Sequence, residues 1–472
     1  MSTSLSSEPA AVRRSIPPSM LAALADWLGP RFSIAAAIRE HHGRDESPLE
    51  SMLPDAVVFA ESTAEVVRIM QLAHEHAVPV IPYGTGTSLE GHVLAVQGGI
   101  SIDVSRMNRV LRIDAGDMTA TVEAGVTRNA LNEALRHEGL FFPIDPGADA
   151  SLGGMSATRA SGTNAVRYGT MRENVLGLTV VTATGEVVHT GTRARKSSSG
   201  YDLTRLFVGS EGTLGVITEV TLRLHPQPQA VSAAVCHFPS IEAAVRATIH
   251  IIQQGIAIAR CELLDETTVM AVNRHSHLGL QERPMLLMEF HGTEASVREQ
   301  AEAVQEIARD VGGEDFQWTT TPEERTRLWK ARHSAFFALL QLKPGARSVT
   351  TDVCVPISRL ADCIVETQAD LRTIDIPAGI LGHVGDGNFH VAMLVDPTKP
   401  EERATAEAVN DRLTNRALSM EGTCTGEHGI GLHKMRFFLQ EHDSSAVALM
   451  REVKRAFDPK NILNPGKIFH LS

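Results

Sequence analysis

The chain has 472 residues, of which 43% are apolar and 21% charged, and this composition predicts a folded globular protein with two or three domains. Its 44 basic and 56 acidic residues give a formal net charge of −12, which argues against nucleic acid or an anionic membrane surface as the main partner. No apolar run approaches the roughly 18 residues needed to cross a bilayer, so no transmembrane segment is expected.

The five cysteines are scattered, odd in number and without a CxxC spacing, at positions 236, 261, 354, 363 and 424. This pattern indicates neither a disulfide framework nor a thiolate zinc site, and it fits a reduced compartment. We therefore expect a cytoplasmic protein, at most peripheral to a membrane. Residues 1–20 are serine-rich and contain Arg13 and Arg14, as transit peptides do, but Glu8 and the prolines at 17 and 18 make a mitochondrial location less favoured.

Residues 1–50 are expected to form a disordered lead and a short helix. From residue 54 onward, short strands alternate with helices, which predicts an α+β or α/β domain over residues 51–226. Ser62 and Glu65 have the spacing of a capping box at the start of one helix. The elements predicted here are a helix from Ser19 to Leu28, strands from Ala56 to Ala60 and Val78 to Pro82, and a helix from Ala64 to His76.

The second of these strands runs directly into a glycine-rich loop, Pro82-Tyr83-Gly84-Thr85-Gly86-Thr87-Ser88. Successive backbone N–H groups in such a loop form a concave nest that binds phosphate oxygens without a basic residue. The loop lacks the fingerprint of NAD-binding proteins, because Leu89 occupies the third glycine position and residues 90–100 show no amphipathic helix. Taken alone, the loop is a weak signal, and a structural turn explains it better than a phosphate site does.

Two further segments are rich in glycine, serine and threonine, one from Pro143 to Gly169 and one from Gly209 to Ile217. The latter is a tight turn that enters a predicted strand from Val216 to Leu224. Backbone that lies against a large polar cofactor explains this composition better than packing does. The candidate cofactor-binding residues in these segments are Pro146, Gly147, Ser151, Gly153, Gly154, Gly162, Asn164, Tyr168, Gly169, Glu211, Gly212, Gly215, Val216 and Ile217.

A linker at residues 225–228 precedes a second domain, residues 227–420, in which the order of strands and helices is repeated. Residues 421–472 are expected to form a mostly helical segment that returns to the cofactor. The first predicted unit contains Ala233–Phe238, the helix Ser240–Gln254, Cys261–Leu264, Met285–Phe290 and the helix Glu294–Val311. The second contains the helix Pro322–Leu342, the strand Ser348–Pro356, the helix Ser358–Thr373 and a hairpin.

The hairpin is expected to turn at Asp386-Gly387, a pair favoured in two-residue loops of the I′ type. His383 would then stand directly opposite His390, with Cβ atoms roughly 5 Å apart. That spacing suits two ligands of one metal ion, and Glu427, in a glycine-rich segment, is the candidate third ligand. A polar sheet face without a metal explains the two histidines about equally well on spacing alone.

The three glycine-rich segments together resemble the FAD-binding domain of the vanillyl-alcohol oxidase family, also called the PCMH type, over about residues 50–225. The resemblance implies a two-subdomain α+β domain in which the first segment holds the pyrophosphate and the others surround the isoalloxazine and adenosine. Some members bind the flavin covalently through a histidine in the first segment. Here threonine and serine occupy that stretch and His92 comes late, so non-covalent FAD is expected.

The C-terminal half resembles the cap of FAD-linked D-2-hydroxy acid dehydrogenases, an α+β domain with an antiparallel sheet. The resemblance implies that His383, His390 and Glu427 bind a divalent metal. Two nitrogens and a carboxylate can bind Zn, Mn, Fe or Co, so the identity of the metal stays open. It also implies that His428 is the active-site base, that Arg332 binds the substrate carboxylate, and that Asn464 lies near the flavin. A solvated basic helix face and a common Asn-Pro-Gly turn are the alternatives for Arg332 and Asn464.

The implied reaction is oxidation of a short aliphatic D-2-hydroxy acid, such as D-lactate, with hydride transfer to flavin N5. The strand at residues 348–356 has no lysine or arginine and carries Asp352, so a second substrate carboxylate would lack a partner. The alternatives are the 2-hydroxyglutarate and glycolate oxidase branches, a metal-dependent hydrolase, and a catalytically silent flavin subunit. No nicotinamide, iron–sulfur or haem-attachment motif is present, which implies cytochrome c, a quinone or an electron-transfer flavoprotein as acceptor.

Overall fold

The computed structural model describes residues 13–471, so the first twelve residues of the expected N-terminal lead lie outside it. Within this range, every helix falls short of the length and hydropathy that a membrane span requires. The described part begins with α1 (Pro18–Leu28), η1 (Gly29–Arg31), β1 (Phe32–Ser33) and α2 (Ala36–His42). Helix α1 buries Met20, Leu24 and Leu28, whose four-residue spacing places them on one helix face.

The first subdomain is a four-stranded sheet in the order β1-β2-β4-β3, in which β4 lies between two parallel neighbours. Its elements are β2 (Ala56–Phe59), α3 (Thr63–His76), β3 (Val80–Tyr83) and β4 (Ile100–Asp103). The predicted capping box of α3 is only half formed. Ser62 Oγ accepts the N–H of Glu65, but the Glu65 carboxylate accepts the N–H of Glu61 and binds Arg31 instead of returning to Ser62.

The second subdomain is a five-stranded antiparallel sheet in the order β5-β6-β10-β8-β9. It shares one hydrophobic core with the first sheet, so the two subdomains form a single α+β unit, as predicted. Its strands are β5 (Val110–Asp114), β6 (Thr119–Glu123), β8 (Val175–Val181), β9 (Val187–His189) and β10 (Val216–Arg223), while β7 (Leu140–Phe141) pairs with β11 (His225–Pro226). Its helices are α4 (Arg128–Ala134), α5 (Leu152–Thr158), α6 (Ala165–Tyr168), α7 (Met171–Asn174) and α8 (Leu203–Phe207).

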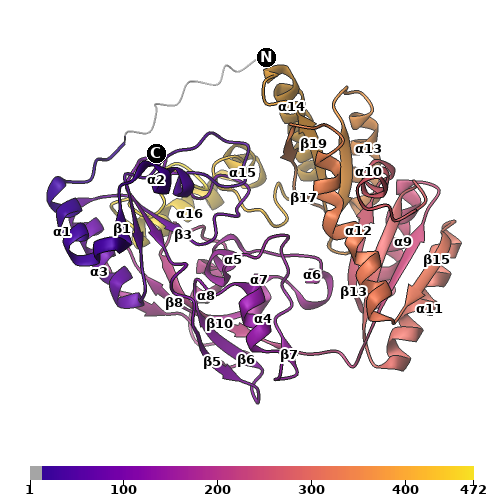
Figure 1. Ribbon diagram of the computed structural model, residues 1–472, viewed down its shortest axis with the longest axis horizontal. Helices are drawn as coiled ribbons and strands as arrows, with labels where there is room; N and C mark the ends of the chain where they lie inside the picture. The colour runs from indigo at the N-terminus through magenta and orange to yellow at the C-terminus, as the bar shows by residue number, and fades with distance from the viewer. Residues whose placement is uncertain (1–12, 472) are drawn as a thin grey trace.

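The cap is an antiparallel sheet in the order β15-β12-β14-β13-β18-β19-β16, with β17 beside β19 (Figure 1). The elements β12-α9-β13-β14-α11 and β16-α13-β18-β19-α14 share the order strand, helix, strand, strand, helix, with α10 inserted between β13 and β14, and the halves join through β13 and β18. The first half is β12 (Ala230–His237), α9 (Ile241–Gln253), β13 (Ile258–Leu264), α10 (Glu266–Ser276), β14 (Met285–Gly292), α11 (Glu294–Asp310) and β15 (Glu314–Thr319). The second is α12 (Pro322–Leu340), β16 (Arg347–Thr350), β17 (Val353–Cys354), η2 (Ile357–Arg359), α13 (Leu360–Leu371), β18 (Ala378–Gly382), η3 (Val384–Asp386), β19 (Asn388–Val395) and α14 (Pro400–Ser419).

The two faces of the cap sheet differ in what covers them. Helices α9, α11, α13 and α14 bury one face, while α10 and α12 cover part of the other. Because side chains alternate along a strand, the residues next to the buried apolar positions point toward the second face. On this face lie the polar residues Arg260, Glu262, Glu289, His291 and His390.

The predicted two-residue turn at Asp386-Gly387 is wrong. Leu381, not His383, is opposite His390, and the N–H of Asn388 donates to the carbonyl of His383, so the loop contains four residues. The loop folds inward because Val384 is fully buried in the cap core. Since the register differs from the prediction by two residues, and not by one, His383 stays on the same face as His390 and becomes its diagonal neighbour.

The single strand predicted from Ser348 to Pro356 is also wrong, because it is interrupted between β16 and β17. The N–H of Val391 binds Thr351 Oγ1 at 2.9 Å, and His390 Nδ1 donates to the carbonyl of Thr351 at 3.0 Å. The N–H of Thr351 keeps a backbone hydrogen bond to the carbonyl of Val391 at 3.0 Å, whereas side chains bind the Thr351 carbonyl and the N–H of Val391. Asp352 becomes available to bind the C-terminal segment.

The C-terminal segment lies against the N-terminal part of the chain, with α15 (Met435–Glu441) and α16 (Ser444–Phe457) beside α2 and β3 in Figure 1. Leu463 forms a parallel bridge with Val80 of β3, and Ile462 and Leu463 enter the core of the first domain. The turn before them is held by Asp458, which is fully buried and accepts the N–H groups of Ile462 and Leu463 at 3.0 and 2.7 Å. Lys454 pairs with Asp458 and donates to the carbonyl of Thr213.

We expect Asp458→Asn to lower the free energy of unfolding by about 3–5 kcal/mol, because it leaves the buried Lys454 ammonium without its counter-charge. Asp443→Asn is the matched control, since Asp443 caps the other end of α16 near the surface and asparagine caps a helix about as well, so the free energy of unfolding should change little. Urea denaturation followed by circular dichroism measures both. Equal losses in the two variants would contradict the anchoring role of Asp458.

Candidate active site

The three glycine-rich segments converge in space. A Cβ atom on Gly84 would lie 2.3 Å from Ser151 Oγ, and one on Gly212, whose φ is +72°, would lie 3.0 Å from Pro82. The N–H groups of Gly209 and Glu211 donate to the carbonyls of Ser156 and Ala157, both at 2.9 Å. The close approach of these backbones explains why glycine is needed at these positions.

The first segment has the properties of a phosphate-binding loop. Within the described residues, the N–H groups of Thr85, Gly86, Thr87 and Ser88 donate no hydrogen bond to the protein. Backbone N–H groups are strong donors, and a run of them without partners in a partly exposed loop provides a cradle for an anion. The segment therefore fits the pyrophosphate of FAD, in agreement with the sequence analysis.

The remaining candidate residues of the second and third segments lie in helix ends, close backbone contacts and one buried strand. Ser151 caps α5, and Gly153 and Gly154 lie in its first turn. Gly162 packs on Asp145, Gly169 ends α6 with a φ of +74°, and Gly215 contacts Val180. Pro146 is half-buried and Gly147 exposed, while Val216 and Ile217 are buried in β10. Their roles in holding the cofactor stay predictions.

Asn164 and Tyr168 lie where the second segment meets the cap. Arg260 Nε donates to Asn164 Oδ1 at 3.0 Å, and Tyr168 Oη is 2.7 Å from His291 Nδ1. His291 in turn binds Glu289 at 2.8 Å. These two residues thus connect the cofactor-binding domain to the polar face of the cap sheet.

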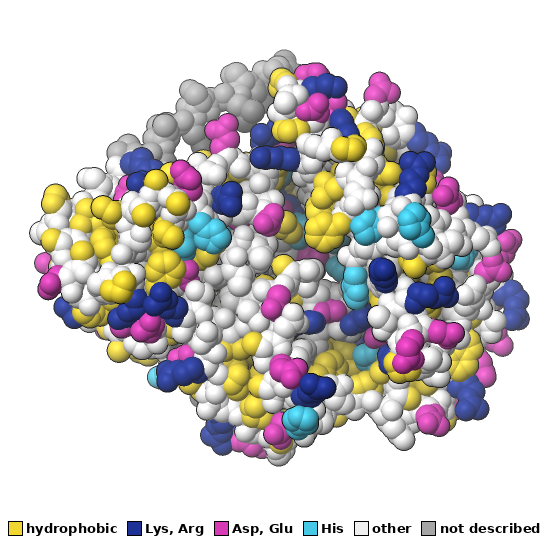
Figure 2. All heavy atoms as spheres, viewed as in Figure 1, with side chains coloured by type: hydrophobic (Ala, Val, Ile, Leu, Met, Phe, Trp, Pro, Cys, Tyr) yellow, Lys and Arg dark blue, Asp and Glu magenta, His cyan; other side chains and the backbone are white. Residues whose placement is uncertain are grey.

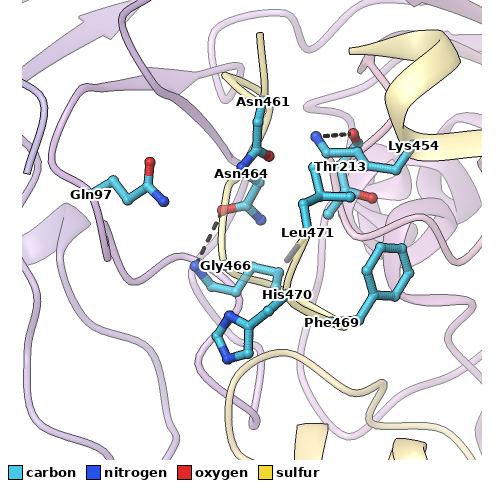
Figure 3. Close-up of a pocket in the computed structure, with 10 residues that line it drawn as sticks. Gln97, Thr213, Lys454, Asn461, Asn464, Gly466, Phe469, His470 and Leu471 are labelled. Carbon is cyan, nitrogen blue, oxygen red and sulfur yellow. Dashed lines mark hydrogen bonds between the residues drawn. The ribbon is translucent and has the colours of Figure 1, made fainter. Parts of the chain in front are cut away.

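Asn464 joins the third segment to His92, which lies four residues after the first segment. Its side-chain amide donates to the carbonyls of His92 and Glu211 at 3.0 and 2.8 Å, and its oxygen accepts from Lys467. Figure 3 shows Asn464 beside a cavity of about 160 Å³, which Lys454 and Lys467 also line.

Burial lowers the pKa of Lys467 to about 7, and its ammonium donates to the carbonyl of Leu94 at 2.6 Å.

Glu211 connects the third segment to the loop that carries His428. It has a φ of +54°, and its carboxylate oxygens accept the N–H groups of Ile430 and Gly431 at 2.7 and 2.8 Å. The carboxylate is 6% exposed. The Glu211 side chain is therefore occupied by the C-terminal segment, and its expected contact with the cofactor stays a prediction.

His383, His390 and Glu427 come together as the sequence analysis predicts. Glu427 Oε1 lies 3.2 Å from His383 Nε2 and 3.3 Å from His390 Nε2. Ligand atoms that each lie about 2.1 Å from a tetrahedral metal are about 3.4 Å apart, so these separations suit a shared cation. Each histidine binds an acceptor through its other nitrogen: Glu262 for His383 and the Thr351 carbonyl for His390. This pattern is typical of metal-ligating histidines, and the donor set fits a divalent ion.

Asp352, His390 and His428 form a second cluster of possible ligands. Asp352 is 1% exposed, and its Oδ2 already accepts Thr425 Oγ1 and the N–H groups of Glu427 and His428. The Lys434 ammonium lies 3.3 Å from the same oxygen and would repel a cation. We therefore assign Asp352 to anchoring the loop and not to binding a metal.

Arg332 lies beside the histidine cluster, whereas Arg327 and Lys330 of the same helix are exposed. Its Nε donates to Glu262 Oε2 at 2.6 Å, and the other Glu262 oxygen accepts His383 Nδ1 at 2.7 Å. Among the described residues, the Arg332 Nη atoms have no hydrogen-bond partner. Arg332 thus has donors left for a substrate carboxylate.

His428 stacks on His390, with ring centroids 5.2 Å apart and planes at 5°. Its Nδ1 lies 3.2 Å from Glu90 Oε1. Burial opposes its charge, but the negative charges of Asp352 and Glu90 outweigh burial and raise the pKa of His428 above its ordinary value. The imidazole therefore stands between the candidate metal ligands and the first glycine-rich segment.

Comparison with known proteins identifies the family. Residues 54–191 match the model described as an FAD binding domain, and residues 227–468 match the C-terminal domain of FAD linked oxidases. The chain belongs to the FAD-linked oxidase family. It is therefore an FAD-linked oxidoreductase, as the sequence analysis predicts. It is 52% identical over 443 residues to "Probable D-lactate dehydrogenase, mitochondrial" of Danio rerio, covering 93% of this chain and 89% of that protein.

Two other relatives of this FAD-linked oxidase are informative. It is 45% identical to "D-lactate dehydrogenase (cytochrome), mitochondrial" of Arabidopsis thaliana, covering 96% of this chain and 81% of that protein. It is 35% identical to "Glycolate oxidase subunit GlcD" of Bacillus subtilis, covering 93% of this chain and 94% of that protein. The structure of p-cresol methylhydroxylase aligns with a TM-score of 0.79 at 18% identity, covering 98% of this chain and 99% of that chain, which confirms the predicted fold.

The expectation of a cytoplasmic location is wrong, because the relatives at 52%, 45%, 41% and 38% identity are named as mitochondrial proteins. The expectation rested on composition, charge and scattered cysteines. These quantities do not encode a compartment, since targeting signals are addresses that receptors read.

Sequence analysis missed the side chains that support the candidate site of this oxidase. The signals were present but weak: Glu90 follows the first glycine-rich segment, and Glu262 lies with Arg260 in a strand whose other residues are apolar. His433 and Lys434 lie in the glycine-rich segment that contains His428. Asp352 was noted only as a charge unfavourable to a second substrate carboxylate. None of these residues has a local pattern that predicts its partner.

His433 makes the stability of this oxidase depend on pH. Burial opposes its charge, but hydrogen bonds to Glu407 and Glu90 raise the pKa of His433 to about 9. Because the folded pKa lies above the unfolded value of about 6.5, this stabilisation is complete below about pH 6.5 and is lost as the pH rises through about 9. We expect His433→Asn to cost on the order of 2 kcal/mol at pH 6 and much less at pH 9.5.

The unfolding midpoint in urea at several pH values measures this difference. His442→Asn, a substitution at a more exposed histidine nearby, serves as the control and should show a small, pH-independent change. A His433→Asn difference that stays constant from pH 6 to 9.5 would contradict the assignment.

Proposed function

We propose that the protein oxidises a D-2-hydroxy acid, D-lactate or a similar short aliphatic acid, to the 2-oxo acid with FAD and a divalent metal. The observation that carries the proposal is the position of His428. Its ring stacks on His390, whose Nε2 faces Glu427, and its loop is bound by Glu90 and Glu211 of the FAD-binding domain. A base, a metal-ligand set and the cofactor loops therefore meet at one place.

Each side chain has a defined part in the proposed reaction. The free guanidinium nitrogens of Arg332 bind the substrate carboxylate, and a planar bidentate pair fixes its orientation. His383, His390 and Glu427 hold the metal, which when bound would lower the pKa of the substrate hydroxyl. His428 takes the hydroxyl proton through Nε2, because its Nδ1 faces Glu90. The FAD-binding domain would hold FAD, which would supply the acceptor for the hydride of C2.

The preference for a small substrate is supported by the surroundings of Arg332. Phe336 follows one helical turn later, on the same face of α12, and is apolar. The basic residue of β16 and β17 is Arg347, which is exposed at the start of β16. The buried Lys434 ammonium beside Asp352 is already paired with Asp352 and Glu90, so a second carboxylate would find no free cation there among the described residues. The relatives named as D-lactate dehydrogenases agree with this substrate, while the glycolate oxidase subunit keeps glycolate as the second candidate.

The proposal extends to the acceptor and the domains. A relative whose name includes cytochrome supports a cytochrome as the electron acceptor over a quinone or an electron-transfer flavoprotein. We propose residues 227–420 as the cap and residues 421–472 as the segment that returns to the flavin. A metal-dependent hydrolase would leave the FAD-binding domain without a purpose.

We expect the purified protein to be yellow, with FAD released by acid or heat. Chelation, His383→Ala and His390→Ala should each reduce turnover at least about 100-fold without loss of FAD absorbance, because the ligands belong to the cap. Turnover with an artificial acceptor, flavin absorbance and metal content are the measurements, and His442→Ala is the control. Normal flavin reduction by the metal-free enzyme would contradict the metal role.

We expect D-lactate and D-2-hydroxybutyrate to reduce the flavin faster than D-2-hydroxyglutarate. Burying a second carboxylate without a cation costs several kcal/mol. A barrier raised by about 3–4 kcal/mol lowers the rate by about two to three orders of magnitude. Anaerobic stopped-flow bleaching with each acid at matched concentration decides the order. Fastest reduction by D-2-hydroxyglutarate would place the enzyme in another branch of the family.

A further inference from the structure

Glu90 is a buried acid of the FAD-binding domain that binds three cationic or polar groups of the C-terminal segment. It is 1% exposed and lies two residues after the glycine-rich loop Pro82–Ser88. Its Oε1 lies 3.2 Å from both His428 Nδ1 and Lys434 Nζ, and its Oε2 lies 2.8 Å from His433 Nδ1. The two histidines are thus held by different oxygens of one carboxylate.

The main chain docks at this place independently of the Glu90 carboxylate. The carbonyl of Glu90 accepts the N–H groups of Leu432 and His433 at 2.8 and 3.2 Å. Gly431, with a φ of +52°, packs so closely that a Cβ would lie 2.2 Å from the Glu90 carbonyl oxygen. Glu211 binds the N–H groups of Ile430 and Gly431 as well. The Glu90 carboxylate is therefore not needed to position the backbone of the loop.

The carboxylate is ionised and is the acceptor for His428 Nδ1. Burial opposes ionisation, but the Lys434 charge and the two histidine hydrogen bonds hold the pKa of Glu90 well below its usual range. The other acid near His428 Nδ1 is Asp352, whose Oδ2 is 4.0 Å away and already accepts several donors. An N–H at Nδ1 therefore points to Glu90, which leaves the lone pair of a neutral imidazole on Nε2.

We propose that Glu90 is a positioning residue that fixes the Nδ1–H tautomer and the ring orientation of His428, so that Nε2 faces the substrate hydroxyl. The inference rests on the proposed function, because it takes His428 as the base. A buried carboxylate that selects the tautomer of a catalytic histidine contributes several orders of magnitude in rate without contacting the substrate. Here the carboxylate follows the cofactor loop, so the base is oriented by the domain that binds FAD.

The test is anaerobic flavin reduction by D-lactate in Glu90→Gln, followed by stopped-flow absorbance. Glutamine keeps the shape and one acceptor but removes the charge that selects the tautomer. We expect the limiting reduction rate to fall by about 10²–10⁴, with the Kd for D-lactate within about threefold of the parent and unchanged FAD and metal content. Glu407→Gln is the matched control, because Glu407 binds His433 on the side away from Glu90 and should leave the rate unchanged.

Glu90→Asp keeps the charge but shortens the side chain, and it decides the question if Glu90→Gln does not fold. We expect an intermediate rate with the same Kd for D-lactate. In the background of His428→Asn, Glu90→Gln should slow the reaction no further, because Glu90 acts through His428. Additive losses in the double variant, or the parent rate in Glu90→Asp, would overturn the inference.

The outcomes separate this inference from the proposed function. A slow His428→Asn enzyme beside a fast Glu90→Gln enzyme overturns the role of Glu90 and leaves His428 as the base. Parent rates in both variants overturn the proposed function itself. A slow Glu90→Gln enzyme that has also lost FAD, metal or substrate affinity shows that Glu90 is structural, and this too overturns the inference.

Discussion

The docking of the two domains of this oxidase depends on three buried carboxylates that all accept hydrogen bonds from one loop. Asp352 comes from the cap, and Glu90 and Glu211 come from the FAD-binding domain; none is more than 6% exposed. The loop donates to them through main-chain N–H groups between residues 427 and 431 and through side chains from Thr425 to Lys434, and Asn388 of the cap also donates to Asp352. A buried carboxylate without donors costs several kcal/mol, so the two domains and the loop are stable only together.

Much of the fold follows from the sequence. Strand alternation, the helix cap at Ser62 and the three glycine-rich segments predict the cofactor-binding domain, because each of these signals is local. The repeated order of elements predicts the symmetric halves of the cap sheet. The helix α10 and the strand β15 were not predicted. Their sequences are short and polar, and they are stabilised by packing on the sheet.

The candidate metal ligands could be predicted from the sequence, whereas the acids that bind the histidines could not. His383 and His390 meet although the turn between them was wrong, because a shift of two residues keeps side chains on one face. Glu262 and Glu90 could not have been predicted, since each meets its histidine across more than 100 residues of sequence. Such contacts depend on how the sheets dock, and no spacing or periodicity encodes docking.

The bridge between Leu463 and Val80 means that a segment synthesised long after β3 completes the first sheet. At about 5–20 residues per second, a ribosome needs on the order of half a minute to produce the residues between them. During this interval β3 presents an open edge, and Asn464 is not yet in place to donate to the carbonyls of His92 and Glu211. The nascent FAD-binding domain is therefore incomplete until the cap has been synthesised, which makes flavin loading an event that follows synthesis of the cap.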